Sequence, residues 1–204
     1  MHYFKNPTKE EIKIAADLIN DNELVAFPTE TVYGIGAKID EKAIDKLYDL
    51  KGRDKKKPFT IHISDLEQVN IFVKNVPDEF YILAKKILPG PLTVVLKNKR
   101  KEFSYLSEND NLGFRFPSDE IAIDFIKKIK FPILATSANF SNQTSLVLAE
   151  DILNNFKDKI SCILDGGESH LKRASTVIHL VDGNFEILRE GSISKEEIFA
   201  VFSC

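Results

Sequence analysis

The stretch Leu24-Val-Ala-Phe-Pro-Thr-Glu-Thr-Val-Tyr-Gly-Ile-Gly36 decides the fold class. Its first half is a short apolar run ended by Pro28, a pattern typical of a buried strand. Its second half sets two hydroxyls, a carboxylate and a phenol before two glycines. It has neither the spacing of a dinucleotide fingerprint nor the GK[ST] of a P-loop. It is therefore either a ligand-binding loop of another kind or a polar turn whose glycines allow tight backbone geometry.

Helical and strand patterns alternate outward from this stretch. Thr8 followed by Glu11 has the form of a capping box, and apolar residues at helical spacing then predict a helix over 9–20. A second helix begins near Asp40 and carries Ala43, Ile44, Leu47 and Leu50 on one face. Further strands are predicted at 59–63, 92–96, 113–116, 133–136, 161–164, 176–180 and 186–188, and further helices at 65–72, 78–87, 119–129, 149–156 and 194–202.

This interleaving continues through the chain without a low-complexity linker, an internal repeat or a break in composition. A length of 204 residues, 43% of them hydrophobic, suits one domain with a sizeable core. We therefore predict a single α/β domain over residues 1–204 with a mixed, largely buried sheet.

Composition and the N-terminal residues narrow the cellular context. No apolar segment reaches the roughly 18 residues of a membrane span, and the first residues lack the apolar core of a signal peptide. The two cysteines, Cys162 and Cys204, offer no metal-ligand spacing. We expect a soluble protein of the reducing cytoplasm, with no membrane partner.

Charge is distributed unevenly along the chain. The formal net charge of −3 divides into −4 over residues 1–50, +7 over 51–101 and −6 over 102–204. The densest run, from Lys51 to Lys57, holds five cations in seven positions. Such a run is either a solvated surface or a site for an anion or a nucleic acid, and composition alone does not choose between them.

Lys51, Arg53 and Lys57 are the first candidate ligand-binding residues. Arginine binds phosphate bidentately and lysine acts as a point charge, so the three can hold different oxygens of a polyphosphate. The strand that follows carries His62 on the face opposite to Ile61. A lone histidine in such a strand is more often a half-buried structural residue than a catalytic one.

Two later segments also carry polar groups at strand ends. Arg115 sits inside an apolar strand, where an unpaired cation is costly, so it needs a carboxylate or a ligand as partner. Thr136, Ser137 and Asn139 form either a helix cap or Asx turn, or a set of neutral donors for a phosphate or a nucleotide sugar. No nucleophile and base pair stands out. The candidate groups are mostly cations and neutral hydrogen-bond donors, and such a set suits reactions between anionic substrates, such as phosphoryl or nucleotidyl transfer.

Read together, seven motifs in series resemble the YrdC-like family of L-threonylcarbamoyladenylate synthases. They are PTETVYGIG at 28–36, KGR at 51–53 with PFTIHI at 58–63, PGPLTVVL at 89–96, GFRFPSD at 113–119, ATSANFS at 135–141, STVIHL at 175–180 and ILREG at 187–191. The resemblance implies a twisted mixed sheet flanked by helices around a large open cavity. The chain resembles the short, bacterial-type form of the family.

The activity implied by the resemblance is nucleotidyl transfer. Such a synthase joins L-threonine, bicarbonate and ATP into threonylcarbamoyladenylate and releases pyrophosphate. A downstream transferase complex then passes the threonylcarbamoyl group to adenosine 37 of tRNAs that read codons starting with A. The resemblance leaves open whether tRNA touches this chain.

The family pattern also implies residue roles. The residues expected to line the threonine pocket are Thr31, His62, Arg115, Ala135 and Ser175. Those expected to hold ATP are Lys51, Arg53, Lys57, Asn111, Ser137, Asn139, Ser145 and Arg189. Lys51 and Arg53 are expected to be catalytic through charge stabilisation, and Mg²⁺ to be held by the ATP phosphates without a protein ligand set. Lys57 departs from the family, which usually has a small polar residue there.

Two alternative functions are weighed against the synthase. One is a carbamoyltransferase-type activity, because a YrdC-like module occurs in larger hydrogenase-maturation enzymes, although their acylphosphatase and zinc-finger regions have no counterpart here. The other is a non-catalytic RNA-binding module that uses the basic stretch 51–101. It predicts RNA affinity that falls steeply with salt and no ATP-dependent product.

Overall fold

The computed structural model describes residues 1–97, 99–107, 109–141, 143–181 and 184–202. Cys204 lies outside the described residues. The described strands form one mixed sheet in the order β1-β8-β2-β3-β7-β4-β6-β5-β9-β10. They are β1 (His2–Lys5), β2 (Val25–Phe27), β3 (Gly34–Ala37), β4 (Thr60–His62), β5 (Leu92–Leu96), β6 (Leu112–Arg115), β7 (Ile133–Ser137), β8 (Cys162–Asp165), β9 (Thr176–Val181) and β10 (Asn184–Arg189).

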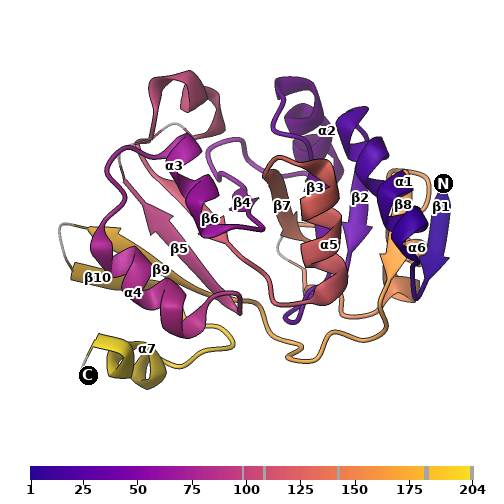
Figure 1. The fold of residues 1–204 in the computed structure, drawn as a ribbon. Coiled ribbons are helices and arrows are strands. Elements are labelled where there is room, and N and C mark those ends of the chain that lie inside the picture. The colour runs from indigo at the N-terminus through magenta and orange to yellow at the C-terminus, as the bar shows by residue number, and fades with distance from the viewer. Residues whose placement is uncertain (98, 108, 142, 182–183, 203–204) are drawn as a thin grey trace.

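Helices pack on this sheet through their apolar faces. The α-helices are α1 (Lys9–Asn20), α2 (Glu41–Lys51), α3 (Val69–Phe72), α4 (Asp78–Ile87), α5 (Glu120–Ile129), α6 (Ala149–Phe156) and α7 (Lys195–Phe202), and the 3₁₀ turns are η1 (Leu66–Gln68) and η2 (Lys101–Leu106). In the view of Figure 1, α1 and α5 lie side by side at one end of the sheet, and α4 and α7 lie at the other.

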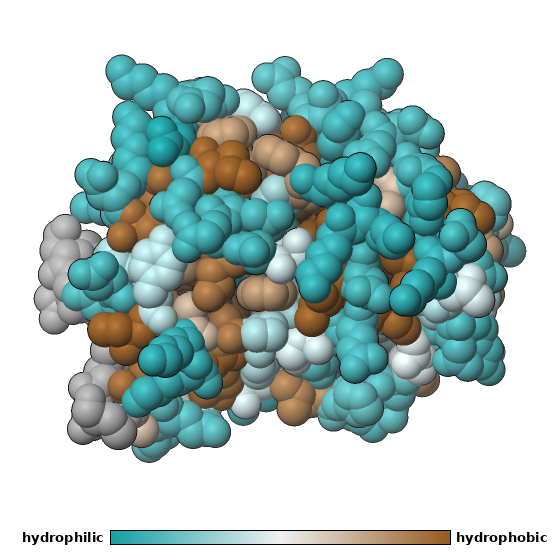
Figure 2. Space-filling view, viewed as in Figure 1, coloured by the Kyte–Doolittle hydropathy of each residue, from teal (hydrophilic) through white to brown (hydrophobic). Residues whose placement is uncertain are grey.

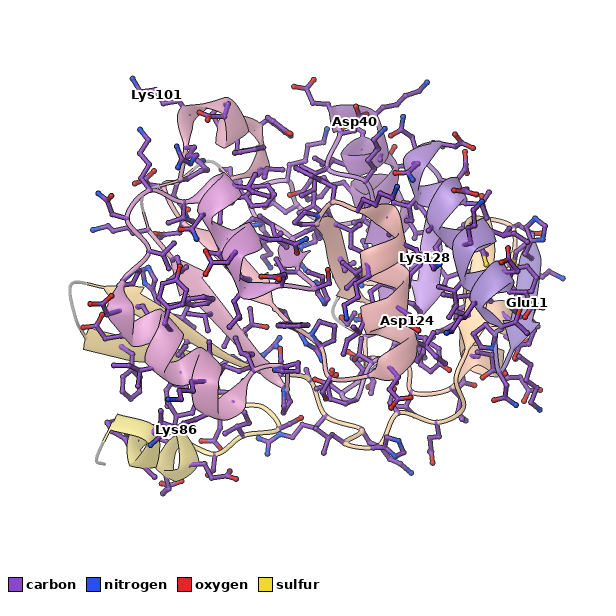
Figure 3. All side chains as sticks on the ribbon, in the orientation of Figure 1. Glu11, Asp40, Lys86, Lys101, Asp124 and Lys128 are labelled. Carbon is purple, nitrogen blue, oxygen red and sulfur yellow. The ribbon has the colours of Figure 1, made fainter. Side chains whose placement is uncertain are left out.

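The apolar side chains form two core clusters. The larger contains Tyr33, Leu47, Phe72 and Phe114, and the smaller lies beneath α1 and α5 and contains Phe27. Figure 3 shows the charged side chains of α5 on its outer side, and Figure 2 shows the hydrophilic surface that such residues give the helices. Burial of one face per helix supplies the main stabilising free energy of the fold.

The structure confirms the predicted α/β class and most of the predicted elements. The capping box of α1 is present, because the Thr8 side chain accepts from the Glu11 backbone and the Glu11 side chain accepts from the Thr8 backbone. The predicted helix over 65–72 is divided into η1 and α3. Two strands were not predicted, β1 and β3.

The glycines after Tyr33 lie in strand β3, so of the two interpretations left open for this stretch the polar turn is wrong, and Thr29, Tyr33 and Gly34 line the cavity described below. Gly34 pairs with Phe27 and Ser137, and Gly36 pairs with Val25 and Ala135. A Cβ atom on Gly34 would lie 3.1 Å from Phe27 Cζ, and one on Gly36 would lie 3.1 Å from the Ile133 side chain. These glycines therefore serve close packing across the strand.

Within the described ranges, no helix is both long and apolar enough to cross a membrane.

Candidate functional site

A cavity of about 410 Å³ lies on one face of the central strands. This volume falls within the range of roughly 300–1,000 Å³ typical of small-molecule sites. Its floor follows from the two-residue alternation of strand side chains. The cavity is lined by Val177 and His179 of β9 and by Ser175, which directly precedes β9. The alternate residues Ile178 and Leu180 belong to the larger core cluster.

Strand register arranges the floor in rows. One row runs across the sheet through His62, Arg115, Thr93 and Val177. The next row runs through Ala135, Thr60, Gly113, Val95 and His179. Successive rows are about 7 Å apart, because a strand rises ~3.3 Å per residue. Asn111 directly precedes β6 and begins a third row, so its backbone lies about 13 Å along the extended chain from Arg115.

Arg115 lies at one end of this floor and forms the internal salt bridge that the sequence left open. It is 7% exposed, and its Nη2 donates to Glu30 Oε1 at 2.9 Å and to Thr31 Oγ1 at 2.6 Å. The second Glu30 oxygen accepts from the Ser118 backbone at 3.1 Å. Arg115 Nε has no hydrogen-bond partner among the described residues. The guanidinium is thus fixed by Glu30 and keeps a donor for a ligand.

His62 lies beside Arg115 in the first row. It is buried, and its Nδ1 lies 3.4 Å from the Thr60 carbonyl oxygen. A carbonyl oxygen only accepts, so the proton lies on Nδ1 and Nε2 is left as an acceptor. Burial, and then the positive charge of Arg115, lowers the pKa of His62 to about 3. The imidazole is therefore neutral at physiological pH.

Two hydroxyl groups close the same end of the cavity. Thr93 Oγ1 and Ser175 Oγ are 2.8 Å apart. The Ser175 carbonyl accepts from Arg189 Nη2 at 2.8 Å. A β-bulge between Ile187 and Arg189 shifts the alternation of β10, so that Leu188 and Arg189 both line the cavity.

Arg53 and Arg189 are the cations of the cavity wall. Arg53 donates to the Lys57 carbonyl at 3.0 Å and to the Pro58 carbonyl at 3.2 Å, and its guanidinium lies over the Phe59 ring. Within the part of the chain that the structure describes, neither arginine has a carboxylate at ion-pair distance.

The pKa values of both arginines are lowered, but only that of Arg189 is lowered by neighbouring positive charges. Burial lowers the pKa of Arg53, and partial burial, followed by the charges of Arg115 and Arg53, lowers that of Arg189. Cations that share a cavity without a counter-ion attract an anionic ligand.

Lys51 lies behind the cavity wall and does not line it. Its ammonium donates to the Ser137 carbonyl at 2.6 Å, to Asn139 Oδ1 at 2.9 Å and to the Asn139 carbonyl. All three of its donors are used within the protein. Burial, and then the charge of Arg53, lowers the pKa of Lys51 to about 8. Lys51 therefore holds the loop that presents Ser137.

The structure brings most of the predicted site residues together. Those that line the cavity are Arg53, His62, Asn111, Arg115, Ala135, Ser137, Ser145, Ser175 and Arg189. Thr31, Lys51 and Asn139 support its wall through hydrogen bonds. The Lys57 side chain is exposed, and only its carbonyl contacts Arg53.

Several lining or supporting residues were not predicted. They are Thr29, Glu30, Thr60, Thr93, Asn109 and His179. Strand alternation counted from Ser175 places His179 on the cavity face, so the sequence held that signal. The pairing of Glu30 with Arg115 joins residues 85 positions apart, and no local pattern shows it.

Comparisons with known proteins agree with this geometry. A family model described as Sua5/YciO/YrdC, telomere recombination, matches residues 17–191. A Pyrococcus abyssi protein named Threonylcarbamoyl-AMP synthase is 42% identical over 190 residues, which is 92% of this chain and 56% of that protein. A Bacillus subtilis protein of the same name is 37% identical over 194 residues, 94% of this chain and 56% of its own length.

A solved structure shares the fold closely. It is the crystal structure of P. abyssi Sua5 complexed with L-threonine, with a TM-score of 0.93 and 39% identity, covering 99% of this chain and 60% of that one. The chain thus spans little more than half the length of these relatives.

Proposed function

The chain belongs to the Sua5/YciO/YrdC family, and from this membership we propose that it is an L-threonylcarbamoyladenylate synthase. It would join L-threonine, bicarbonate and ATP and release pyrophosphate. The names of the Pyrococcus and Bacillus relatives and the threonine complex of Sua5 support this reaction.

One observation carries the proposal. Arg53 and Arg189 face a cavity without a carboxylate partner among the described residues, and the fixed guanidinium of Arg115 lies in the same cavity. Three guanidinium groups in one site suit two anionic substrates, one of them highly charged. An electropositive site lowers the repulsion between such substrates before they react.

L-Threonine fits the Arg115 end of the cavity. The guanidinium would bind its carboxylate through the donors that Glu30 leaves free, and His62 Nε2 would accept from its amine or hydroxyl. Thr31 supports Arg115 from behind the wall, while Ser175 and the Ala135 backbone close the pocket. The family's threonine assignments are thus consistent with one compact set of contacts.

ATP fits the remaining rows of the floor. Arg53 and Arg189 would hold the triphosphate, with Ser137, Ser145 and Asn111 as neutral donors. Lys51 and Asn139 would act mainly by fixing the Ser137 loop, with the Lys51 charge adding to the field. Lys57 would contribute at the mouth of the site.

The chemistry follows from this placement. The neutral amine of threonine attacks bicarbonate with release of water, or attacks CO₂ with release of a proton to solvent, and either gives a carbamate. A carbamate oxygen then attacks the α-phosphorus, and the bond to the leaving pyrophosphate breaks. Arg53 and Arg189 offset the charge that develops on the phosphates. Positioning of the two reactants supplies much of the rate enhancement, because both would lie on the floor of one cavity.

Magnesium would enter with ATP. Across the described ranges, no group of three or more His, Cys, Asp or Glu side chains could hold a metal ion. A cation coordinated by phosphate oxygens and water needs no such cage, and it would neutralise charge on the leaving pyrophosphate.

His62 would bind substrate without acting as a base. A group with a pKa of about 3 holds almost no proton at neutral pH, so it cannot accept one from an ammonium efficiently. We expect the fall of kcat/KM at low pH to be the same in His62→Asn as in the wild type. Loss of that fall in the variant would assign the base to His62.

Pyrophosphate release tests the reaction. The protein is incubated with ATP, Mg²⁺, L-threonine and bicarbonate, and each substrate is omitted in turn. We expect pyrophosphate and threonylcarbamoyladenylate only when all are present. Release that requires carbamoyl phosphate instead would indicate a carbamoyltransferase-type enzyme. RNA binding with a steep salt dependence and no pyrophosphate would indicate the RNA-binding module.

The product would pass to other proteins. An acyl adenylate is an activated intermediate, so we propose that a downstream transferase complex takes the threonylcarbamoyl group to tRNA. Transfer to tRNA in a reaction reconstituted with such a complex, absent when this chain is omitted, is the corresponding test.

A further inference from the structure

Only one of the three guanidinium groups that line the cavity has a carboxylate partner among the described residues. Arg115 Nη2 lies 2.9 Å from Glu30 Oε1, whereas Arg53 and Arg189 form no ion pair within the same ranges. The ammonium of Lys51 adds a positive charge behind the wall, and its partners there are carbonyl and amide oxygens. The positive charge of the cavity is therefore compensated at Arg115 and uncompensated around Arg53 and Arg189.

Glu30 is held in place as the counter-ion of Arg115. The side chains of Glu30 and Arg115 are only 10% and 8% exposed. One carboxylate oxygen pairs with the guanidinium, and the other accepts from the Ser118 backbone N–H at 3.1 Å. Glu30 does not line the cavity, so its effect on a bound ligand is electrostatic and is exerted from behind Arg115.

The net charge at Arg115 determines which class of ligand this end of the cavity holds. An amino-acid zwitterion has no net charge and needs directed donors for its carboxylate. Arg115 Nε is such a donor, because it has no hydrogen-bond partner among the described residues. A polyphosphate carries several negative charges and is attracted mainly by net positive charge. The ion pair with Glu30 keeps the free donor of Arg115 but cancels most of its net charge at a distance.

We propose that Glu30 is a specificity residue that excludes phosphate anions from the amino-acid end of the cavity and so confines ATP and pyrophosphate to the surroundings of Arg53 and Arg189. This inference rests on the proposed function for the identity of the two substrates. Without the Glu30 charge, the three guanidinium groups would form one continuous cationic surface, on which a polyphosphate could bind in more than one position. A polyphosphate over Arg115 would block the amino acid, so the counter-ion restricts each substrate to one position.

Competition between inorganic pyrophosphate and L-threonine tests this role without catalysis. Calorimetry measures the Kd of L-threonine at increasing pyrophosphate concentrations for the wild type, Glu30→Gln and Glu30→Asp. We expect the wild-type Kd to stay constant, because pyrophosphate binds only around Arg53 and Arg189. In Glu30→Gln, pyrophosphate should compete with L-threonine, and its affinity for the Arg115 end should rise by about tenfold or more, since a negative charge at close range is removed.

Glu30→Asp separates the charge of the side chain from its shape. It keeps the carboxylate and should exclude pyrophosphate as the wild type does, even if its shorter side chain weakens L-threonine binding. Glu30→Gln keeps the length of the side chain, but its one amide oxygen replaces two acceptors, so a lower melting temperature is also expected. Lower stability alone only weakens binding, whereas loss of the charge strengthens the binding of an anion.

Glu168→Gln is the matched control. It removes an exposed carboxylate that pairs with Lys172 at 2.7 Å and does not line the cavity. In this variant the Kd of L-threonine should be independent of pyrophosphate, as in the wild type.

Three results would overturn the inference. The first is a wild type in which pyrophosphate competes with L-threonine, and this measurement stands even if Glu30→Gln does not fold. The second is a folded Glu30→Gln in which pyrophosphate does not compete. The third is equal competition in Glu30→Asp and Glu30→Gln, which would make the shape of the side chain the cause instead of its charge.

Failure of the proposed function would give a different result. A wild type that does not bind L-threonine would reject the proposed substrate. The number of pyrophosphate ions bound per chain would still report on Glu30, because we expect one in the wild type and a second in Glu30→Gln. Absence of the second ion would then overturn the role of Glu30.

Discussion

At the residue scale, the two cations of the KGR motif differ in what they contact. Arg53 lines the cavity, donates to backbone carbonyls of its own loop and lies over the Phe59 ring, whereas Lys51 donates to Ser137 and Asn139. Their spacing of two residues allows this, because α2 ends at Lys51 and Gly52 turns the chain with a φ of 55°. The backbone reversal separates a buried ammonium from a guanidinium at the wall.

Arg53→Ala should lower turnover by about 100-fold, the usual effect of removing one preorganised charge-stabilising donor. Arg53→Lys should recover part of the loss, because the charge returns without the bidentate geometry. Steady-state pyrophosphate release measures both. Arg173→Ala is the control, since its side chain is 60% exposed and its one ion pair among the described residues is with Glu190 at 3.8 Å. Wild-type turnover in Arg53→Ala would contradict the assigned role.

The lowered pKa of Lys51 predicts that catalytic efficiency falls at alkaline pH. Lys51 donates three hydrogen bonds only while it is protonated, and its pKa is about 8. The kcat/KM for ATP should therefore fall as the pH rises through that value. Lys51→Arg, whose guanidinium stays protonated, should lose this alkaline limb even if its overall rate is lower. An alkaline limb that persists in Lys51→Arg would assign it to another group.

At the scale of elements, β3 depends on two glycines at close packing distance from neighbouring side chains. Gly36→Ala would bring a Cβ atom to 3.1 Å from Ile133 Cδ1 and 3.2 Å from Phe27 Cε1. Overpacking of this kind should lower the free energy of unfolding by about 1–3 kcal/mol. Urea denaturation measures it. Gly113→Ala is the control, because its nearest neighbour would be at an ordinary 3.6 Å. Equal stabilities would refute the packing role.

Amphipathic patterns explain why most elements could be predicted from the sequence. α1 and α5 show their apolar faces at helical spacing, and β5 is an apolar run bounded by Pro91 and charged residues. β1 could not be predicted, because its exposed edge position gives HYFK no apolar alternation. β3 was hidden because GIGA contains glycines, which are depleted in strands generally.

The site was predictable only where the motifs themselves carry ligand-binding residues. The resemblance named nine cavity-lining residues, but the local sequence does not show that Lys51 points behind the wall. That orientation depends on Ser137 and Asn139, 86 and 88 positions away. Long-range pairing of this type follows from the sheet order, which places β7 between β3 and β4.

At the scale of the whole molecule, one sheet joins the two proposed substrate positions. Both lie on strands of the same floor, so each ligand should stabilise the entire fold. ATP with Mg²⁺ and L-threonine should each raise the melting temperature, with about 2.7 kcal/mol gained at a ligand concentration 100 times the Kd. Thermal unfolding of the intact chain measures this.

Arg115→Lys should lose the shift from L-threonine and keep that from ATP, because only the amino acid is expected to use the bidentate donor. Equal loss of both shifts would show that the substitution had disturbed the floor itself. Retention of the full L-threonine shift would move the carboxylate contact away from Arg115.

The bulge in β10 has a consequence for the surface that the cavity offers to a ligand. In a regular strand, consecutive side chains point to opposite faces. An apolar residue and a cation on the same face must therefore be two positions apart, with a residue of the other face between them. The extra residue between Ile187 and Arg189 places Leu188 and Arg189 next to each other on the cavity face. A single irregular step in the backbone thus places an apolar and a cationic side chain next to each other, so that they would contact chemically different parts of one bound ligand. Removing Leu188 would restore regular alternation and keep the cation, which would separate the two contacts in one deletion.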